Sequence, residues 1–346
     1  MSDFAVLKER IERAGLLRPA TGWYRRRIAL DLLVVAAAWT LVLCAGGTVM
    51  RILSAVALAI AFCQIGLLAH DAAHHQILRS ARGNQLLALV LLDGVVGLSL
   101  AWWQKKHGRH HRLPNHADAD PDAAAFVLAF SEAQALRIPS GQRWIVRRQA
   151  WLFLPLLMLE GFHLRQESFR TVLRGSGRYP RAEGAALCLH FGAYLSLLLW
   201  RFGVAGALLV VVVHHVAMGV YLGLVFAPNH IGMTMLDDDG ELDFVRTQVL
   251  TTRNIRPGAV VDYLFGGLNH QIEHHLFPRM PRPHLRAARD IVRRFCCDRG
   301  IPYRERRVMG AYAEVLASLH RAGAPLRAGR RSDRRGDPSG DRSLAA

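Results

Sequence analysis

Four runs of apolar residues, each about long enough to cross a lipid bilayer, constrain the fold of this 346-residue chain more than any other feature. A membrane-spanning helix needs roughly 20 consecutive apolar residues. Only short turns separate the first run from the second and the third from the fourth. The sequence therefore predicts an all-α integral membrane protein with four transmembrane helices in two hairpins, at about residues 28–50, 52–69, 184–202 and 204–227.

Charges beside the first hairpin predict how the chain is oriented. Residues 1–27 are polar and contain seven Lys or Arg side chains, and such segments stay on the cytoplasmic side of a membrane. Two hairpins return the chain to that side. We therefore expect a basic cytoplasmic segment 1–27, a membrane domain 28–305 and a cytoplasmic segment 306–346. The last is predicted to be disordered from about residue 321, because large apolar residues are almost absent there.

Two shorter apolar runs, at residues 85–103 and 150–162, contain Asp93 and Glu160. Histidine clusters lie on both sides of the first run, and they can meet only if this run does not cross the membrane. We therefore predict interfacial or re-entrant helices under a cytoplasmic, His-rich cap. The alternative for residues 85–103 is a fifth span.

Overall charge narrows the class of partner. The chain has 44 Lys or Arg against 27 Asp or Glu, a formal net charge of +17. On a membrane protein this charge indicates anionic headgroups or an anionic substrate. No DNA- or RNA-binding motif accompanies it, so we expect no nucleic-acid partner. The five cysteines form no CxxC pair, which argues against a zinc knuckle or a disulfide framework.

Histidine placement carries the strongest chemical signal. Three clusters, at residues 70–75, 107–111 and 271–275, each follow an apolar segment, and His230 ends the fourth run. Within each cluster, residues spaced i, i+3 and i+4 share one face of a helix. Imidazole nitrogens suit Fe, Cu, Zn and Ni. Because at least seven such nitrogens would lie at one membrane depth, the sequence predicts a metal site with two ions.

Other histidines are predicted to have no metal role. His214 and His215 lie in the middle of the fourth run, where we expect neutral, packed side chains. Four more are isolated along the chain and are interpreted as ordinary solvated residues: His163, His190, His284 and His320.

Taken together, these clusters resemble those of the integral-membrane fatty acid desaturases, the di-iron enzymes with three histidine boxes. The similarity is greatest to the branch whose third box begins with Gln, which includes the front-end and linoleoyl-CoA desaturases. It extends from about residue 30 to residue 305. The matching segments are HDAAHHQ (70–76), AWWQKKHGRHHRLPN (101–115), DPD (120–122), FAPNHIG (226–232), QVLTTRNI (248–255) and GGLNHQIEHHLFPRMPRPHL (266–285).

This resemblance implies a cofactor, a reaction and a ligand set. The cofactor would be two Fe ions, with O₂ as co-substrate, and the reaction would introduce a C=C bond into an acyl chain. Gln271 stands where related enzymes carry another His, so it would be a ligand or a hydrogen-bond donor to one, and His75 is a less favoured neighbour. The implied iron ligands are His70, His74, His107, His110, His111, His230, His274 and His275.

Several further residues receive roles from the same resemblance. Four carboxylates, Asp71, Asp120, Asp122 and Glu273, would orient imidazoles, as metal-binding histidines usually require. A simple turn is the alternative for residues 120–122. His270 replaces a residue that is often aromatic in the family. Trp102 and Trp103 would be interfacial anchors or would line the mouth of a substrate channel.

Partners follow from the expected reaction. The acyl substrate would be linked to CoA, carrier protein or lipid. Six arginines after the third cluster would contact its phosphates or the membrane surface: Arg279, Arg282, Arg286, Arg289, Arg293 and Arg294. The chain has no haem, flavin or iron–sulfur motif, so electrons would come from a separate ferredoxin or cytochrome b5-like donor. We expect the enzyme in the plasma membrane of a bacterium.

Two other functions compete with desaturation. A related di-iron hydroxylase, ketolase or alkane monooxygenase would use similar histidine boxes, and its product would gain oxygen instead of losing two hydrogens. A membrane haem or metal-transport protein is the non-enzymatic alternative, although haem sites typically pair histidines across helices in mid-membrane.

Overall fold

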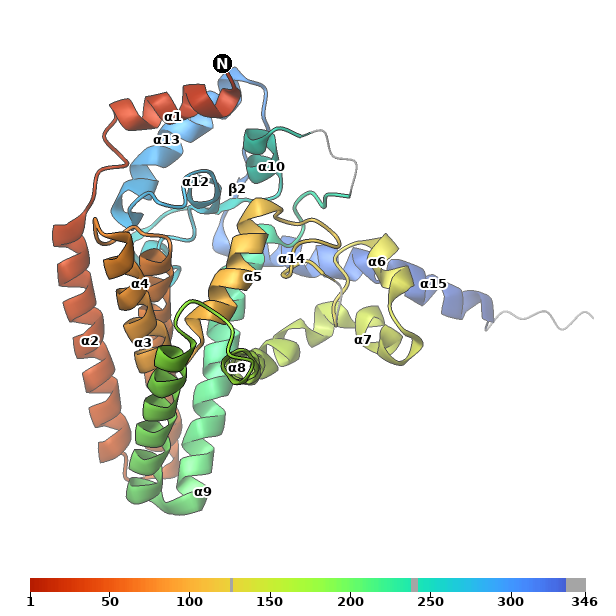
Figure 1. The fold of residues 1–346 in the computed structure, drawn as a ribbon. Coiled ribbons are helices and arrows are strands. Elements are labelled where there is room, and N and C mark those ends of the chain that lie inside the picture. The colour runs from red at the N-terminus through yellow and green to blue at the C-terminus, as the bar shows by residue number, and fades with distance from the viewer. Residues whose placement is uncertain (125–126, 238–241, 334–346) are drawn as a thin grey trace, which may run out of the picture.

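The computed structural model describes residues 1–124, 127–237 and 242–333, and these are mostly helical (Figure 1). One parallel pairing joins two very short strands. The elements that position the site are described below. The others are α6 (Glu132–Arg137), the 3₁₀ helix η2 (Ser140–Gln142), α7 (Arg143–Arg147), α11 (Ala259–Leu264), β1 (Asn254–Ile255), β2 (Glu305–Arg306) and α14 (Val308–Ala322).

Within the described residues, three helices are long and apolar enough to cross a membrane: α2 (Thr21–Cys44), α3 (Thr48–Ala73) and α9 (Pro180–His230). Helix α9 is broken at Gly203, whose φ of 63° is left-handed. Tyr194 and His214 lie 20 residues apart, yet their ring centroids are 5.6 Å apart. A straight helix would separate them by about 30 Å. The two arms of α9 therefore lie side by side and form a second hairpin next to α2 and α3 (Figure 1).

The first predicted hairpin exists, but its boundaries differ from the prediction. Helix α2 begins at Thr21 and ends at Cys44, and α3 begins at Thr48, so the turn lies earlier than predicted. Arg51 belongs to the first turn of α3, where its N–H donates to the Gly47 carbonyl at 3.0 Å. The hydropathy pattern alone does not give these boundaries, because α2 and α3 both include polar residues beyond the apolar runs. Helix α3 likewise continues past residue 69 and carries the first histidine cluster at its end.

Residues 85–103 do not form one straight helix. Helix α4 (Ala81–Leu89) runs into the π-helix η1 (Val90–Val96), and the chain then bends by 114° before α5 (Leu100–Arg112). This geometry fits a re-entrant segment or a broken span. Gly97 sits at the bend with a φ of 77°, and Arg165 donates to the carbonyls of Val96 and Gly97.

Arg165 comes from α8 (Gln149–Leu173), a helix longer than the predicted run 150–162. It also lies 3.2 Å from Nε2 of His215, whose Nδ1 lies 2.8 Å from the Val211 carbonyl oxygen. Nε2 thus accepts and Nδ1 donates, which is the pattern of a neutral imidazole. The prediction of a neutral, packed His215 is confirmed by these contacts.

A hydrophobic cluster separate from the long helices lies beyond their ends. It is built from α1 (Asp3–Arg13), α10 (Phe244–Leu250), α12 (Gln271–Leu276) and α13 (Arg282–Asp298). Helices α1 and α13 pack together at the top of Figure 1, over the third histidine cluster on α12. The packing side chains include Leu7, Ile11, Val249, Ile272 and Phe295, all fully buried or nearly so.

The predicted disorder from about residue 321 is wrong for residues 324–333. Helix α15 (Ala324–Asp333) forms there, because Ala, Leu and Arg are good helix formers. Leu326 packs in a small cluster with Val146 and Ile138, and its carbonyl accepts from Arg147 at 2.9 Å. The rest of the predicted tail, 334–346, lies outside the described residues.

Candidate metal centre

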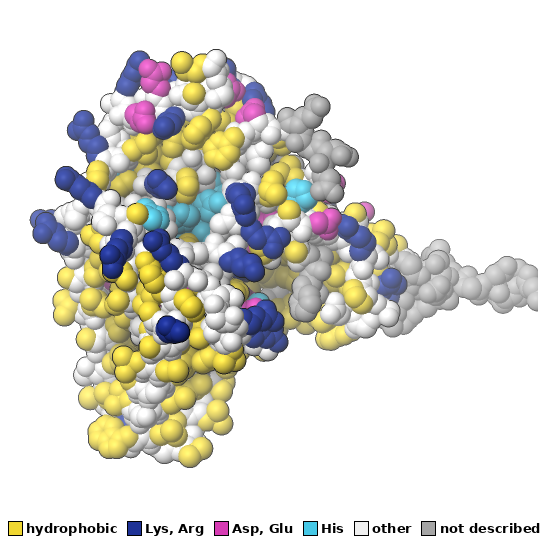
Figure 2. Space-filling model, viewed as in Figure 1, with side chains coloured by type: hydrophobic (Ala, Val, Ile, Leu, Met, Phe, Trp, Pro, Cys, Tyr) yellow, Lys and Arg dark blue, Asp and Glu magenta, His cyan; other side chains and the backbone are white. Residues whose placement is uncertain are grey.

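All three histidine clusters meet at one end of the long helices. The first lies at the C-terminal end of α3, the second in the last turns of α5, and the third on α12. His230 arrives as the last residue of α9. In Figure 2 part of this histidine surface is visible at the upper part of the molecule, surrounded by Lys and Arg side chains.

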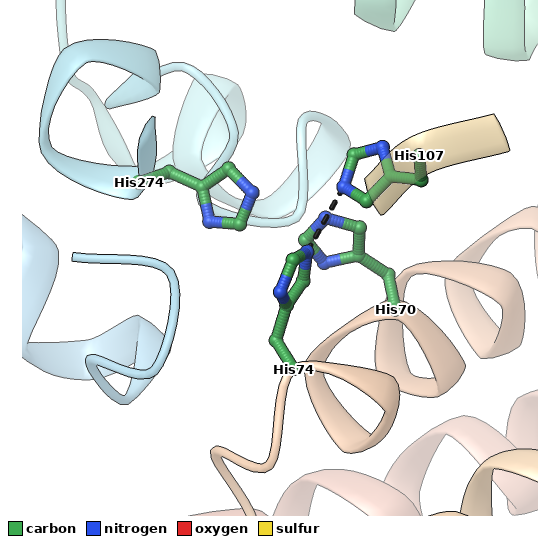
Figure 3. Close-up of side chains that lie close together, drawn as sticks. All are labelled: His70, His74, His107 and His274. Atoms are coloured by element: carbon green, nitrogen blue, oxygen red, sulfur yellow. Dashed lines mark hydrogen bonds between the residues drawn. The ribbon is translucent and has the colours of Figure 1, made fainter. Parts of the chain in front are cut away.

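One group of four histidines brings its ligand nitrogens within 4.8 Å of one another: His70, His74, His107 and His274. Figure 3 shows how they converge from α3, α5 and α12. Nε2 of His107 lies 2.9 Å from Nε2 of His74 (dashed in Figure 3). His111 borders this group, with its Nε2 2.9 Å from that of His107 and 3.1 Å from that of His274.

A second group contains His110, His230 and His275, again with ligand nitrogens within 4.8 Å. Gln271 joins it, because its Nε2 lies 3.0 Å from Nε2 of His230. The rings of His111 and His275 stack with centroids 4.3 Å apart, so His111 lies between the two groups. All nine predicted metal residues are therefore brought together, in two neighbouring groups.

Hydrogen bonds at Nδ1 orient three of these imidazoles. His110 Nδ1 lies 2.9 Å from Asp120 Oδ2, His275 Nδ1 lies 2.9 Å from Gln248 Oε1, and His70 Nδ1 lies 3.3 Å from Asp71 Oδ1. Each acceptor fixes the proton on Nδ1 and leaves the Nε2 lone pair free. The predicted orienting roles of Asp71 and Asp120 are confirmed by these contacts.

Asp120 also forms the turn that was the alternative for residues 120–122. Its backbone carbonyl accepts from Ala123 at 3.1 Å, and its Oδ2 accepts from the Asn115 N–H at 2.8 Å. Asp122 mainly pairs with Lys106, at 2.6 Å, and lies 3.6 Å from His110 Nδ1. His110, Asp120 and Asp122 could also hold a metal ion by distance alone. These existing partners instead indicate a hydrogen-bonded support for His110.

Two sequence-based expectations are wrong. Glu273 does not orient a clustered histidine; its carboxylate accepts from Asn254 at 2.7 Å and from Tyr303 at 2.9 Å. Arg282 does not face phosphates or lipid, because it is buried beside Asp71. Arg289 is also largely buried and pairs with Glu305. Both arginines were expected at the surface, but each instead forms an ion pair with a neighbouring acidic side chain.

Three supporting residues were not predicted. Gln248 holds His275 and also donates to the His111 carbonyl at 3.1 Å. The Asn115 side chain donates to the His230 carbonyl at 3.1 Å, and Arg253 donates to the Pro228 and Ile231 carbonyls at the end of α9. Gln248 and Asn115 lie within segments that match the family, but their spacing alone gives no signal for these contacts.

The remaining nitrogens suit a metal. Nε2 of His70 and Nε2 of His275 are buried and have no hydrogen-bond partner in the part of the chain that is described. Burial, together with the neighbouring imidazoles, holds the pKa of His274 and His275 well below its usual value. Neutral imidazole is the form that binds a metal. The donor set therefore fits two transition-metal ions held by nitrogen.

A cavity of ≈ 300 Å³ borders both groups. Its lining includes His70 and His107 from the first group, and His110 and His230 from the second. Most of the rest is apolar and comes from α3, α5, α8, α9 and the loops beside them. Lys106, Asp122 and Glu160 also line the cavity. Trp102 and Trp103 both line it, and the Trp103 ring stacks on His107 at 4.4 Å. Of the two roles expected for these tryptophans, interfacial anchor or channel lining, their positions fit the lining.

Comparison with known proteins gives the family. The sequence model described as Fatty acid desaturase matches residues 47–307, well over half of the chain. The chain belongs to the fatty acid desaturase family. It is 31% identical over 314 residues to the Delta(8)-fatty-acid desaturase of Euglena gracilis, covering 87% of this chain and 74% of that protein. It is 28% identical to the Delta(6)-fatty-acid desaturase fat-3 of Caenorhabditis elegans, over 92% and 74% of the two chains.

This membership confirms the predicted function: the desaturase acts on fatty acyl chains and is a membrane protein. It also favours iron over the other metals that imidazole binds. The hydroxylase and haem-protein alternatives receive no support from these relatives. Nor does the expected bacterial plasma membrane, because the named relatives are eukaryotic.

Replacing Gln248 by Leu should weaken metal binding without touching a nitrogen ligand. His275 would lose the acceptor that holds its ring and its tautomer, and losses of this kind typically lower metal affinity about 10–100-fold. Iron retained after a chelator challenge measures the effect. Gln166→Leu, on an exposed position of α8, is the matched control. Equal retention in both variants would contradict the role of Gln248.

Proposed function

We propose that the two histidine groups hold two iron ions, and that this di-iron centre desaturates an acyl chain bound in the adjoining cavity, with O₂ as co-substrate. One observation carries the proposal: two separate sets of imidazoles, buried or half-buried, converge on the same largely apolar cavity. A single ion would leave one set without a partner. An apolar cavity beside both sets is what an unactivated alkyl substrate requires.

In this proposal each ion has its own ligands. The first ion is held by His70, His74, His107 and His274, with His111 beside them because its Nε2 faces His107 and His274. The second ion is held by His110, His230 and His275. Gln271 borders the second group, since its amide nitrogen lies 3.0 Å from Nε2 of His230.

The chain's own residues prepare the site for the reaction. Iron in this setting, supplied with O₂ and two electrons, provides the oxidant that removal of hydrogen from an unactivated methylene requires. Asp71, Asp120 and Gln248 keep a proton on Nδ1 of three ligands and so direct Nε2 inward. The apolar cavity wall excludes water and sets which carbon lies beside the metal.

We further propose that α2, α3 and the two arms of α9 are four spans, with the metal centre on the cytoplasmic side. The lower half of the molecule in Figure 2 is largely apolar, whereas Lys and Arg surround the histidine end. Exposed basic residues near that end include Arg25, Arg26, Arg79, Arg82, Lys105, Arg109 and Arg112. Basic segments favour the cytoplasmic side. The same surface would attract an acidic electron donor, such as a ferredoxin or a b5-like protein.

Expression in a host with a compatible donor should yield a new unsaturated fatty acid, detected as its methyl ester by mass spectrometry. His110→Ala should abolish that product and lower the iron content, because the variant removes a ligand bordering the cavity. The matched control is His320→Ala, at an exposed position of α14, and it should keep both. A hydroxylated product, or full activity of His110→Ala, would contradict the proposal.

Gly66 should limit how far an acyl chain can extend past the metal. It lines the cavity on α3, one helical turn before His70, and a Cβ there would meet no atom within 4 Å. Gly66→Val would therefore add methyl groups on the cavity side of α3, starting from a Cβ that has free space. We expect the product profile to shift to shorter acyl chains. Gly192→Val, at an exposed position of α9 with equal space, is the control, and identical profiles would contradict this role.

Membrane orientation can be tested with native cysteines. Cys297 is exposed on α13 beside the metal-centre end, and Cys44 is exposed at the opposite end of α2. A chain retaining only Cys297 should react with an impermeant maleimide only after the cells are permeabilised. A chain retaining only Cys44 should react in intact cells. The reverse pattern would contradict the cytoplasmic orientation, and labelling of both on one side would contradict the hairpin.

A further inference from the structure

A buried network connects Arg282 to the first histidine group. Nε of Arg282 lies 2.7 Å from Oδ2 of Asp71, whose other carboxylate oxygen is 3.3 Å from Nδ1 of His70. The Tyr24 hydroxyl lies 3.1 Å from the same Asp71 Oδ2 and accepts from the Arg282 backbone N–H at 3.0 Å. Three elements, α2, α3 and α13, therefore meet behind one imidazole.

The fold makes room for this arginine specifically. Arg282 is 7% exposed and Asp71 2% exposed, so neither charge reaches bulk water. A second nitrogen, Nη2, donates to the Leu67 carbonyl on α3 at 2.6 Å. A Cβ on Gly267 would lie 2.6 Å from Cγ of Arg282, and the φ of Gly267 is +79°. The absence of a Cβ at Gly267 thus leaves space for the Arg282 side chain to reach α3.

Asp71 needs a positive partner to act on His70. A buried carboxylate without one is costly, and it would turn away from His70. Arg282 compensates the charge. The Tyr24 hydroxyl lies 3.1 Å from the same oxygen and 2.8 Å from Oε1 of Gln76. The other oxygen is then left to face Nδ1 of His70. A fixed Asp71 carboxylate oxygen keeps the His70 proton on Nδ1, which leaves Nε2 for a metal.

We infer that Arg282 is a positioning residue for the first iron: it holds Asp71 so that Asp71 orients His70. The inference rests on the proposed di-iron function and concerns one of its two sites. His110 and His275 of the second group are oriented by Asp120 and Gln248 instead. Loss of the Arg282 contact should therefore affect the two irons unequally.

Iron stoichiometry under a chelator challenge tests this inference. At a chelator concentration that leaves the wild-type chain with two irons, Arg282→Met should retain about one, because loss of an outer partner typically weakens metal binding about 10–100-fold. The matched control is Arg289→Met. Arg289 lies on the same helix and pairs with Glu305 at 2.6 Å, away from the histidines, so its variant should retain both irons.

A double variant separates positioning from folding. Asp71→Asn with Arg282→Met leaves no buried unpaired charge, so it should be as stable as the wild-type chain or nearly so. It should still lose the same iron, to the same extent as Asp71→Asn alone, if Arg282 acts through Asp71. Mössbauer spectra of ⁵⁷Fe-loaded protein should show one of two iron signals lost.

Three results would overturn the inference. Retention of two irons by Arg282→Met, with or without lower thermal stability, would reduce Arg282 to a structural residue and leave the proposed function intact. Equal loss from both sites would also contradict an action on His70. A wild-type chain that binds no iron would overturn the proposed function together with this inference.

Discussion

The structure depends on packing a set of imidazoles together, buried or half-buried, at the ends of membrane-length helices. A buried polar group without a partner costs about 1–3 kcal/mol, and each imidazole has two nitrogens to satisfy. Asp71, Asp120 and Gln248 each accept at one nitrogen of a ring. The other nitrogen faces the centre of a group, where a metal would satisfy several rings at once. Iron binding and folding of this region are therefore expected to be coupled.

Helix ends and breaks place these rings at one level. Helix α3 carries its histidines in its last turn, and α9 ends at His230. The left-handed Gly97 lets the chain bend by 114°, so that α5 can bring the second cluster back to the first. The third cluster arrives on α12, held by the cap of α1, α10 and α13. The three histidine clusters thus depend on three different features: the end of α3, the bend before α5 and the short helix α12.

Much of the site could be predicted from local spacing, because residues three and four apart on a helix share a face. The requirement that the clusters meet also predicted an interfacial or re-entrant helix at residues 85–103, where the structure shows a helix bent by 114°. Supporting contacts such as Gln248 with His275, or Arg282 with Asp71, join residues far apart in the sequence and leave no periodic pattern. Glu273 shows the opposite error: it sits within a histidine cluster, yet it faces Asn254 and Tyr303. The helix ends at Cys44 and Thr48 were also missed, because hydropathy does not report where a helix stops within an apolar run.

The central claim is that two irons lie among these histidines, one in each group. Anomalous X-ray scattering measured at the iron absorption edge, from crystals of the iron-loaded protein, tests it most directly. The account predicts two peaks, the first among His70, His74, His107 and His274, and the second among His110, His230 and His275. One peak, or peaks away from these nitrogens, would contradict it.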